Sequence, residues 1–302
     1  MTIRTSNNWG VPGHITGLFQ IVQDDNPLYM GSRGAGFSIE NLIKTKIIAY
    51  EASKNYQINY NGKPFDGRVS LEVVKNFEEF WEEDLKLIID HNSQLPIQGG
   101  FGTSGAGALG TAFALNELFE LDKSPEELGQ IAHKAEITCK TGLGDVISQL
   151  HSQAEMRLDP GAPGIGVIKK IDWPKNQKIL SIFHGIMSTK DIITNPKKIE
   201  EINTTAFNLL LDLRKNPTLE LFLELSYKFA TESGLLTGEL KELNDFIRAE
   251  GYKSSMIMLG GSIFVVDTRD NLKSCSQLIS DKYPKAKMWI DSLATKGPRI
   301  IT

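Results

Sequence analysis

A glycine-rich stretch that leads into a helix limits what this chain can fold into more than any other part of its sequence. From Gly99 to Asn116 the sequence reads GGFGTSGAGALGTAFALN, with small residues first and a helical pattern after them. Glycine allows turns that other residues avoid and lets a ligand approach bare backbone N–H groups. Because the first N–H groups of a helix lack partners and carry partial positive charge, this stretch predicts a phosphate-binding site.

Two familiar phosphate loops fit this stretch poorly. Gly100, Gly102 and Gly105 match the dinucleotide pattern G-x-G-x-x-G, but that pattern needs a buried strand directly before it. We expect an amphipathic helix there instead, because the apolar residues between Val73 and Ile88 recur at helical spacing. A Walker A loop fails as well, since no lysine follows the last glycines. A structural alternative stays open, in which small residues only let the helix pack closely on a sheet.

Composition and charge narrow the class of partner. The chain has 302 residues, of which 40% are hydrophobic and 23% charged, and a formal net charge of −4; these values are typical of a soluble globular protein. The mild acidity argues against nucleic acid and anionic membranes, so we expect a small-molecule partner. Cys139 and Cys275 lack the spacing of a disulfide framework or a zinc site, and no apolar run predicts a signal peptide or a membrane span. We expect a cytoplasmic protein and leave open whether it forms a homodimer.

The order of the expected elements predicts an α+β fold with two domains. Short β-rich runs with glycine-rich turns precede residue 70, and a helix is expected from Pro125 with Ser124 as its N-cap. We expect another helix in GLGDVISQLHSQAEM, residues 142–156. Glycine and proline cluster in RLDPGAPGIG, which predicts a domain boundary near residue 170. The predicted domains are therefore 1–170 and 171–302, the second with helical stretches among strands.

Motifs found in order along the chain resemble those of the GHMP kinases. The phosphate loop of that family, P-x-x-x-G-L-G-S-S-A, is similar to PIQGGFGTSGA, and its N-terminal P-G-K is similar to PGHITGLF. A helix glutamate before a Gly-Asp segment is present as Glu136 and TGLGDV, and a glycine loop before a strand is present as LGGSIFVV. PGHITG, GSRGAGFSIE, TGLGDVISQ and RLDPGAPGIG together resemble one branch of the family, the archaeal pantoate kinases.

The resemblance implies a two-domain GHMP kinase fold, with an N-terminal α/β ATP-binding domain and a C-terminal ferredoxin-like α+β domain. It implies ATP-dependent phosphorylation of the 4-hydroxyl of pantoate to 4-phosphopantoate, in coenzyme A biosynthesis. ATP and Mg²⁺ are the cofactors that it implies. The residues that it assigns to ATP binding are Gly100, Gly102, Thr103, Ser104, Gly105 and Ala106.

The resemblance also implies roles for carboxylates, and the chemistry of these residues suits them. Asp145 is expected to orient or deprotonate the acceptor hydroxyl, although an aspartate at the start of a helix is often only an N-cap. Glu136 and the Ser104 hydroxyl are expected to bind Mg²⁺, which takes one or two protein oxygens besides phosphate and water. Glu136 could instead be an ordinary helix residue. His133, three residues before it, forms an H-x-x-E pair that we interpret as accidental.

The sequence departs from the family at His14, where many members carry a catalytic lysine. His14 is a candidate for catalysis in place of that lysine and for binding substrate, and the alternative is a half-buried strand histidine. Arg33 and Arg157 are candidates for binding the carboxylate of pantoate, because a guanidinium matches two carboxylate oxygens. Each arginine could instead be a surface residue beside a turn.

Other functions stay open on the sequence alone. A GHMP-type kinase could act on another small alcohol, such as homoserine or mevalonate, or the fold could serve a non-catalytic ligand-binding protein. The presence of Asp145, Glu136 and Ser104 argues against a binding protein without activity. A nicotinamide oxidoreductase is the least favoured, and binding of NAD in place of ATP would revive it.

Overall fold

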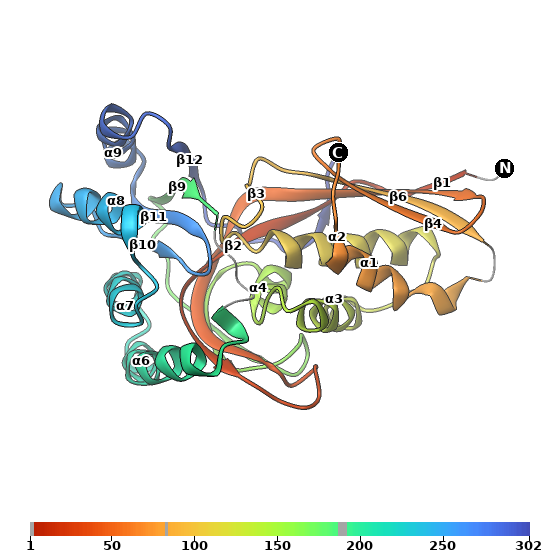
Figure 1. Ribbon diagram of the computed structural model, residues 1–302, viewed down its shortest axis with the longest axis horizontal. Coiled ribbons are helices and arrows are strands. Elements are labelled where there is room, and N and C mark those ends of the chain that lie inside the picture. Colours follow the sequence, from red (N-terminus) through yellow and green to blue (C-terminus); the bar gives the residue numbers. More distant parts are fainter. Residues whose placement is uncertain (1–2, 82–83, 187–191) are drawn as a thin grey trace.

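The computed structural model describes residues 3–81, 84–186 and 192–302, which form two sheets with helices packed on them (Figure 1). The main path of the larger, nine-stranded sheet has the order β13-β2-β3-β6-β4-β5; β1 and β7 also pair with β3, and β8 pairs with β7. The smaller, four-stranded sheet has the order β10-β11-β9-β12. The expected α+β class is confirmed.

The bounds of these elements are as follows. The larger sheet contains β1 (Ile3–Thr5), β2 (Trp9–Val22), β3 (Gly31–Glu51), β4 (Asn55–Tyr60), β5 (Lys63–Pro64), β6 (Leu85–Asn92), β7 (Ala154–Asp159), β8 (Val167–Lys170) and β13 (Arg299–Ile300). The smaller sheet contains β9 (Gln177–Gly185), β10 (Ser254–Ile257), β11 (Gly261–Thr268) and β12 (Lys287–Asp291). The described helices are α1 (Arg68–Lys75), α2 (Thr103–Leu118), α3 (Pro125–Cys139), α4 (Asp145–His151), α6 (Pro196–Lys215), α7 (Leu219–Glu232), α8 (Gly238–Ala249), α9 (Arg269–Lys282) and the 3-10 turn η1 (Glu78–Phe80).

A long hairpin, made of β2 and β3, connects the two halves of the molecule. Its strands pair antiparallel from Trp9 opposite Thr45 to Val22 opposite Gly31. Figure 1 shows both strands curving away from the larger sheet, past α4, towards α6 and α7. The register shifts twice along β2, once between Thr16 and Leu18. Such bulges bend a strand and redirect its side chains, and this one lies beside the cleft described below.

Helices α1–α4 cover one face of the larger sheet (Figure 1). In α2 every residue from Gly105 to Leu115 is buried, because this helix lies between the sheet and its neighbouring helices. Small residues make the close approach possible: a Cβ atom on Gly110 would come within 2.8 Å of the Thr45 Cβ. The small residues of α2 therefore have a packing role in addition to any role in binding phosphate.

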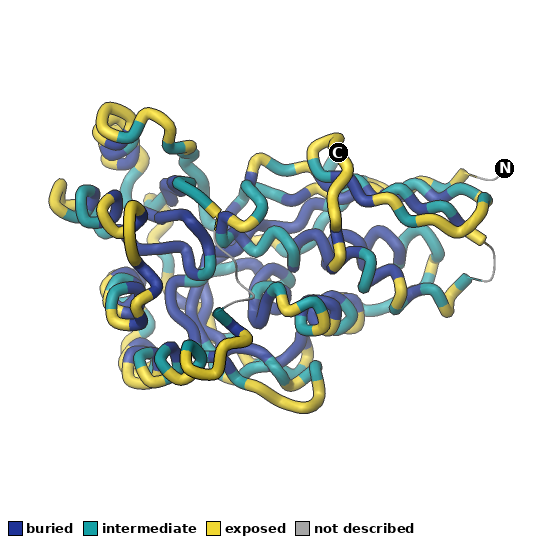
Figure 2. Tube along the Cα trace, in the orientation of Figure 1, coloured by how far each residue is buried: buried dark blue, intermediate teal, exposed yellow. Residues whose placement is uncertain are grey.

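The hydrophobic core continues from one sheet to the other. The Phe37 ring, from β3, packs against Phe222 of α7 and Phe264 of β11, with centroid distances of 6.0 and 5.4 Å. Figure 2 shows buried residues running without interruption between the two halves. The predicted boundary near residue 170 falls between β8 and β9, which belong to different sheets, and stays a prediction. The end of the chain returns to the larger sheet, where β13 pairs with β2.

The single helix expected from the spacing between Val73 and Ile88 is wrong as one element: it is present only at its start, in α1, and residues 82 and 83 lie outside the described part of the chain. This segment forms α1, η1 and strand β6, in which alternate residues from Leu85 to His91 are buried, as a half-buried strand requires. The reason given above against a dinucleotide loop, a helix directly before the glycines, is therefore also wrong. The topology supplies a better reason, because β6 pairs antiparallel with β3 and so does not belong to an all-parallel Rossmann unit.

Of the two helices expected further along the chain, the structure contains one completely and the other in part. The helix from Pro125 is confirmed, and Ser124 caps it in a capping box with Glu127. The helix expected over 142–156 is only partly present, because α4 ends at His151 and β7 begins at Ala154. The left-handed backbone of Ser152, with φ of 45°, separates the two elements.

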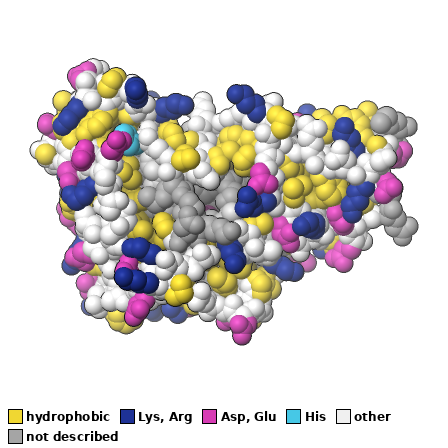
Figure 3. All heavy atoms as spheres, viewed as in Figure 1, with side chains coloured by type: hydrophobic (Ala, Val, Ile, Leu, Met, Phe, Trp, Pro, Cys, Tyr) yellow, Lys and Arg dark blue, Asp and Glu magenta, His cyan; other side chains and the backbone are white. Residues whose placement is uncertain are grey.

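Two observations concern membranes and nucleic acid. Among the described residues, no helix is long and apolar enough to cross a membrane. On the face that Figure 3 shows, the described lysine and arginine side chains are interspersed with aspartate and glutamate. This face therefore offers no extended basic surface of the kind that binds nucleic acid.

Candidate active site

The glycine-rich stretch forms a loop that ends in the first turn of α2. Gly100 and Gly102 have φ angles of 92° and 60°, which residues with a side chain rarely adopt. A Cβ atom on Gly102 would come within 2.9 Å of the Gln149 Nε2 atom. Gly260, between β10 and β11, packs directly on the backbone of Gly99 and likewise has no room for a side chain. No described side chain caps α2, so its first N–H groups can bind an anion.

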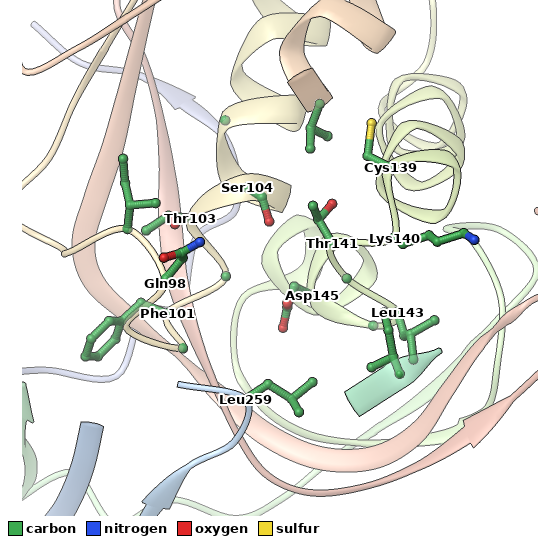
Figure 4. Close-up of a pocket in the computed structure, with 18 of the residues that line it drawn as sticks. Gln98, Phe101, Thr103, Ser104, Cys139, Lys140, Thr141, Leu143, Asp145 and Leu259 are labelled. Carbon is green, nitrogen blue, oxygen red and sulfur yellow. The ribbon is translucent and has the colours of Figure 1, made fainter. Parts of the chain in front are cut away.

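A cleft of about 370 Å³ opens in front of this loop. Figure 4 shows Ser104, at the start of α2, near Thr141 and Asp145 around the same space, with Leu143 and Leu259 further out. Of the residues that the sequence assigned to ATP, Gly100, Gly102, Thr103 and Ser104 line the cleft, whereas Gly105 and Ala106 are buried in the helix behind them.

Glu136 places a buried carboxylate beside the first turn of α2. Its Oε1 accepts a hydrogen bond of 2.6 Å from the Thr141 hydroxyl, and its Oε2 is buried with no partner among the described residues. Oε2 would lie 3.4 Å from a Cβ atom on Gly105. The Ser104 hydroxyl is close enough to the same carboxylate to lower its pKa. Burial raises the pKa of Glu136 to about 7, and the nearby charge of Asp145 also raises it.

An unpartnered carboxylate oxygen next to a hydroxyl suits a cation. No group of three or more His, Cys, Asp or Glu side chains within the described ranges could hold a metal ion by itself. Mg²⁺, however, needs only one or two protein oxygens when phosphate and water complete its shell. Glu136 and Ser104 therefore fit Mg²⁺ that arrives with a nucleotide.

Asp145 begins α4 and lines the cleft, with a side chain that is 25% exposed. Its Oδ1 lies 2.9 Å from Nδ1 of His14, which is completely buried. No described side chain caps the start of α4, so the N-cap alternative for Asp145 is not the one that the structure adopts. Asp145 thus presents a carboxylate whose Oδ2 makes no hydrogen bond to the described residues.

A chain of ionisable side chains runs inward from Asp145. Nε2 of His14 lies 3.0 Å from Oε1 of Glu155, a buried carboxylate on β7. Nη1 of Arg157 donates hydrogen bonds to the same Oε1, at 2.9 Å, and to the Ser148 hydroxyl, at 3.0 Å. Asp145, His14, Glu155 and Arg157 are therefore linked by direct contacts beside the cleft.

The other edge of the Arg157 guanidinium, formed by Nε and Nη2, has hydrogen-bond donors to spare. Nη2 donates a hydrogen bond of 3.3 Å to the Thr16 hydroxyl, and Nε has no partner among the described residues. A Cβ atom on Gly144 would lie 2.7 Å from Nε and would also overlap the Ser32 hydroxyl. Since Nε and Nη2 point the same way, this edge can donate two parallel hydrogen bonds to a carboxylate.

Known proteins with similar sequence and structure identify the family. Residues 68–153 match the N-terminal domain of the GHMP kinases. Pantoate kinase from Methanocaldococcus jannaschii is 35% identical over 271 residues, which cover 89% of this chain and 96% of that protein. Pantoate kinase from Thermococcus kodakarensis is 32% identical over 276 residues, covering 90% and 91%. A solved structure described as a phosphotransferase related to the CoA biosynthesis pathway is 29% identical and has a TM-score of 0.84, covering 99% and 98%.

The chain belongs to the GHMP kinases, in the branch of the pantoate kinases. The resemblance inferred from the motifs is confirmed, and so is the GHMP kinase fold. As a GHMP kinase the protein is an ATP-dependent small-molecule kinase. The open alternatives of a nicotinamide oxidoreductase and of a binding protein without activity are not favoured.

This GHMP kinase places its two candidate arginines differently. Arg157 lines the cleft. Arg33 instead contacts the end of β7: its Nε donates a hydrogen bond to the Leu158 carbonyl, and its Nη2 lies 4.0 Å from Asp159. Ser32, next to Arg33 in β3, lines the cleft, and successive side chains of a strand point to opposite faces. The geometry therefore favours Arg157 for a substrate carboxylate.

His133 has a structural role in this GHMP kinase. Its Nε2 contacts the Pro27 and Met30 carbonyl oxygens at 3.2 and 2.9 Å, which requires that this nitrogen carry a proton. Burial lowers its pKa. A protonated Nε2 cannot bind a metal, so this nitrogen is not available to a metal held by Glu136, and the interpretation of the H-x-x-E pair as accidental stays a prediction.

Glu155 is the residue of this network that the sequence did not reveal. Its segment was expected to continue the helix that contains Asp145, where a glutamate reads as a solvent-exposed residue. The structure has it on β7, buried, because α4 ends at His151 and the chain turns back along β3. Thr16 and Ser32 were likewise missed, since single hydroxyl residues carry no motif.

Proposed function

We propose that this kinase transfers the γ-phosphoryl group of ATP to the 4-hydroxyl of pantoate, giving ADP and 4-phosphopantoate, with Mg²⁺ as the metal. Relatives that are named pantoate kinase and that match nearly the whole chain support the substrate. The observation that carries the proposal is the arrangement of the cleft. The cleft is lined both by Arg157, whose Nε has no hydrogen-bond partner among the described residues, and by the carboxylate of Asp145.

The nucleotide would occupy the part of the cleft next to α2. The loop around Gly100 and Gly102 would hold its phosphates through backbone N–H groups. Further along, the cleft is lined by Tyr60, Phe65 and Val69, which offer an apolar and aromatic surface for a base.

Glu136 and Ser104 would hold Mg²⁺ through the carboxylate Oε2 and the hydroxyl. The chemistry that Mg²⁺ would supply there is neutralisation of the negative charge on the phosphates of ATP. The raised pKa of Glu136 is expected for a buried carboxylate that has no cation beside it, and a bound cation favours its ionised form.

The acceptor would bind on the other side of Asp145. The Nε and Nη2 edge of Arg157 would hold the carboxylate of pantoate, and the Thr16 and Ser32 hydroxyls lie next to that edge for its 2-hydroxyl. Phe19, Ile193 and Met258 also line the cleft and provide an apolar wall for the two methyl groups.

Asp145 would accept the proton of the 4-hydroxyl as that oxygen forms its bond to phosphorus and the bond to ADP breaks. A carboxylate positioned within hydrogen-bond reach is a suitable base for this step. Its Oδ1 is occupied by His14, so Oδ2 is the oxygen that would face the hydroxyl.

The proposed substrate and the two thiols support a proposal for the cellular location. Cys139 and Cys275 are both free, as expected in a reducing compartment. We infer a cytoplasmic enzyme, and fractionation of cells that express the tagged protein tests this.

Steady-state ADP release with pantoate, mevalonate and homoserine tests the substrate. Mevalonate has one more carbon between its carboxylate and its reacting hydroxyl, and homoserine brings an ammonium group towards Arg157. A displacement of about 1 Å can cost on the order of 10²-fold in rate, so we expect kcat/KM to favour pantoate clearly. Mass spectrometry of the product should show 4-phosphopantoate. Equal or better turnover of either rival acid would overturn the substrate but leave the kinase assignment intact.

A further inference from the structure

Two histidines of the larger sheet are buried but have different partners. Nδ1 of His91 lies 2.9 Å from the Thr45 hydroxyl, and its Nε2 lies 3.0 Å from the Ser70 hydroxyl. A hydroxyl can donate or accept, so a neutral imidazole satisfies both contacts. Burial lowers the pKa of His91 to about 4. His91 is therefore neutral at physiological pH.

His14 has a carboxylate at each ring nitrogen. Nδ1 lies 2.9 Å from Asp145 Oδ1, and Nε2 lies 3.0 Å from Glu155 Oε1. An ionised carboxylate only accepts hydrogen bonds, so both contacts require an N–H group on the ring. A neutral imidazole has one such group. The site must therefore hold one further proton, either on His14 or on one of the two acids.

Hydrogen-bond donors and a positive charge surround Glu155. Its Oε1 also accepts hydrogen bonds from Arg157 Nη1 and from the Ser148 hydroxyl, both at 2.9 Å. Arg157 is always charged, and its side chain is only 2% exposed, so Glu155 supplies the counter-charge that a buried guanidinium needs. Asp145 reaches the cleft, where its carboxylate is in contact with solvent. The further proton is therefore on His14.

Electrostatics point the same way. Burial lowers the pKa of His14, but the charge of Glu155 and the hydrogen bonds to Asp145 and Glu155 outweigh burial and raise the pKa above its ordinary value. The groups that contact the ring are Asp145 from α4, Glu155 from β7 and the Thr16 hydroxyl from β2. The positive charge of Arg157 is bonded to Glu155 and does not contact the ring. A charged ring completes a neutral sequence of alternating charges.

The position of the ring is also fixed. A Cβ atom on Gly36 would come within 2.8 Å of both Cε1 and Nε2 of His14, so the ring lies against bare backbone of β3. The backbone N–H of His14 donates a 3.0 Å hydrogen bond to the Phe101 carbonyl in the glycine-rich loop. An imidazole held in this way fixes the carboxylate to which it is bonded.

We propose that Glu155 and His14 form a charged positioning pair, in which Glu155 keeps His14 as an imidazolium and the imidazolium holds Oδ1 of Asp145, so that Oδ2 is left for the acceptor hydroxyl. The proposal rests on the proposed role of Asp145. In it, His14 does not take the proton of the acceptor, because both of its nitrogens are already protonated.

The protonation state of His14 can be read directly, without substrate. In the full-length protein labelled with ¹⁵N-histidine, NMR at pH 7.5 should show both ring nitrogens of His14 protonated. The ring of His91 should show one protonated and one bare nitrogen in the same spectrum, which makes it an internal control. Loss of a signal set in His14→Gln and in His91→Gln assigns the two rings. A bare nitrogen on His14 at pH 7.5 would overturn the proposal.

Glu155→Gln tests the source of the charge. Glutamine keeps the shape of the side chain, so the variant should leave His14 neutral at pH 7.5, lower kcat on the order of 10-fold or more and leave the KM for ATP nearly unchanged. Its kcat should also fall as the pH rises, at a pH where the wild type is unaffected. Ser148→Ala is the matched control, because it removes a neutral donor from the same Oε1, and His14 should keep both protons. A doubly protonated His14 or a wild-type kcat in Glu155→Gln would contradict the proposal.

A second pair of variants covers the case in which Glu155→Gln does not fold. His14→Lys keeps a positive charge between the two carboxylates and should retain more kcat than His14→Gln; the reverse order would count against the proposal. The NMR result is independent of the acceptor. If pantoate is not phosphorylated but His14 carries two protons, the substrate assignment fails and the positioning pair stands.

Discussion

A Cβ atom on Gly142 would overlap Oε2 of Glu136, the carboxylate oxygen that has no hydrogen-bond partner among the described residues. Thr141, the residue before Gly142, donates a hydrogen bond to the other oxygen of the same carboxylate. Thr141 thus orients the Glu136 carboxylate, and Gly142, which has no side chain, leaves room for its Oε2. The same oxygen is the one that we assign to Mg²⁺.

Gly142→Ala should therefore weaken the use of Mg²⁺ without removing any ligand. The added methyl group displaces the Glu136 carboxylate, and a displaced ligand typically costs roughly 10-fold or more in metal affinity or activity. Titration of ADP release with Mg²⁺ at constant ATP should show a higher half-saturating concentration. Gly185→Ala is the control, because a Cβ atom there meets nothing within 4 Å. An unchanged Mg²⁺ requirement in Gly142→Ala would show that the metal is bound elsewhere.

Asp145→Asn should lower kcat while ATP still binds. Asparagine keeps the shape of the side chain but removes the basic oxygen, and a positioned base is typically worth ~10²-fold or more in rate. Steady-state kinetics should show this fall in kcat, and calorimetry should show ATP affinity close to that of the wild type. Asp159→Asn, on an exposed carboxylate, provides the comparison. Turnover of Asp145→Asn near the wild-type rate would mean that another group takes the proton.

Much of the fold could be predicted from the sequence, because local signals and tertiary packing agree in most elements. The capping box at Ser124 and the glycine-rich turn before α2 are examples, since each depends on a few neighbouring residues. The segment 70–93 could not be predicted in the same way. Its apolar residues follow a helical period as far as Phe80 and a strand period from Leu85. Only pairing with β3 and β4 decides in favour of a strand.

Some residues of the candidate site could be predicted from the sequence, and others could not. Ser104, Glu136 and Asp145 lie in motifs, so the resemblance could assign them by position. Glu155 could not be found, because its importance comes from contacts with His14 and Arg157, which are made across β2 and β7 after folding. Arg33 and Arg157 looked equivalent in the sequence, and only the alternation of side chains along β3 distinguishes them.

Arg157→Lys should raise the KM for pantoate strongly and leave the KM for ATP nearly unchanged. Lysine keeps the positive charge beside Glu155 but cannot offer the two parallel N–H groups of the Nε and Nη2 edge. We expect an increase in KM on the order of 10-fold or more, about the value of one charge-assisted hydrogen bond. Arg33→Lys is the matched control and should change neither constant by as much, because Arg33 bonds to the Leu158 carbonyl instead. A larger effect at Arg33 would reverse the assignment of the carboxylate.

Asp291→Asn should stabilise the protein above neutral pH. Asp291 ends β12; its Oδ1 accepts a 3.0 Å hydrogen bond from the Ser292 N–H, and its Oδ2 is buried with no partner among the described residues. Burial raises its pKa from an ordinary 3.8 to about 6. Between these two values the folded protein binds a proton that the unfolded chain has lost. The stability that this carboxyl contributes is therefore complete below pH 3.8 and is lost as the pH rises through about 6.

Asparagine has no charge to bury, so the difference in Tm between the Asp291→Asn variant and the wild type should grow between pH 4 and pH 7 and then level off. We expect a gain of about 2–4 °C at pH 7.5, which corresponds to roughly 1 kcal/mol. Thermal unfolding followed by circular dichroism across this pH range measures it. Asp270→Asn is the control, since that side chain is 93% exposed and its replacement should give a difference that does not depend on pH in this way. A Tm difference for Asp291→Asn that is constant, or that shrinks as the pH rises, would show that the carboxyl is not held in its protonated form by burial.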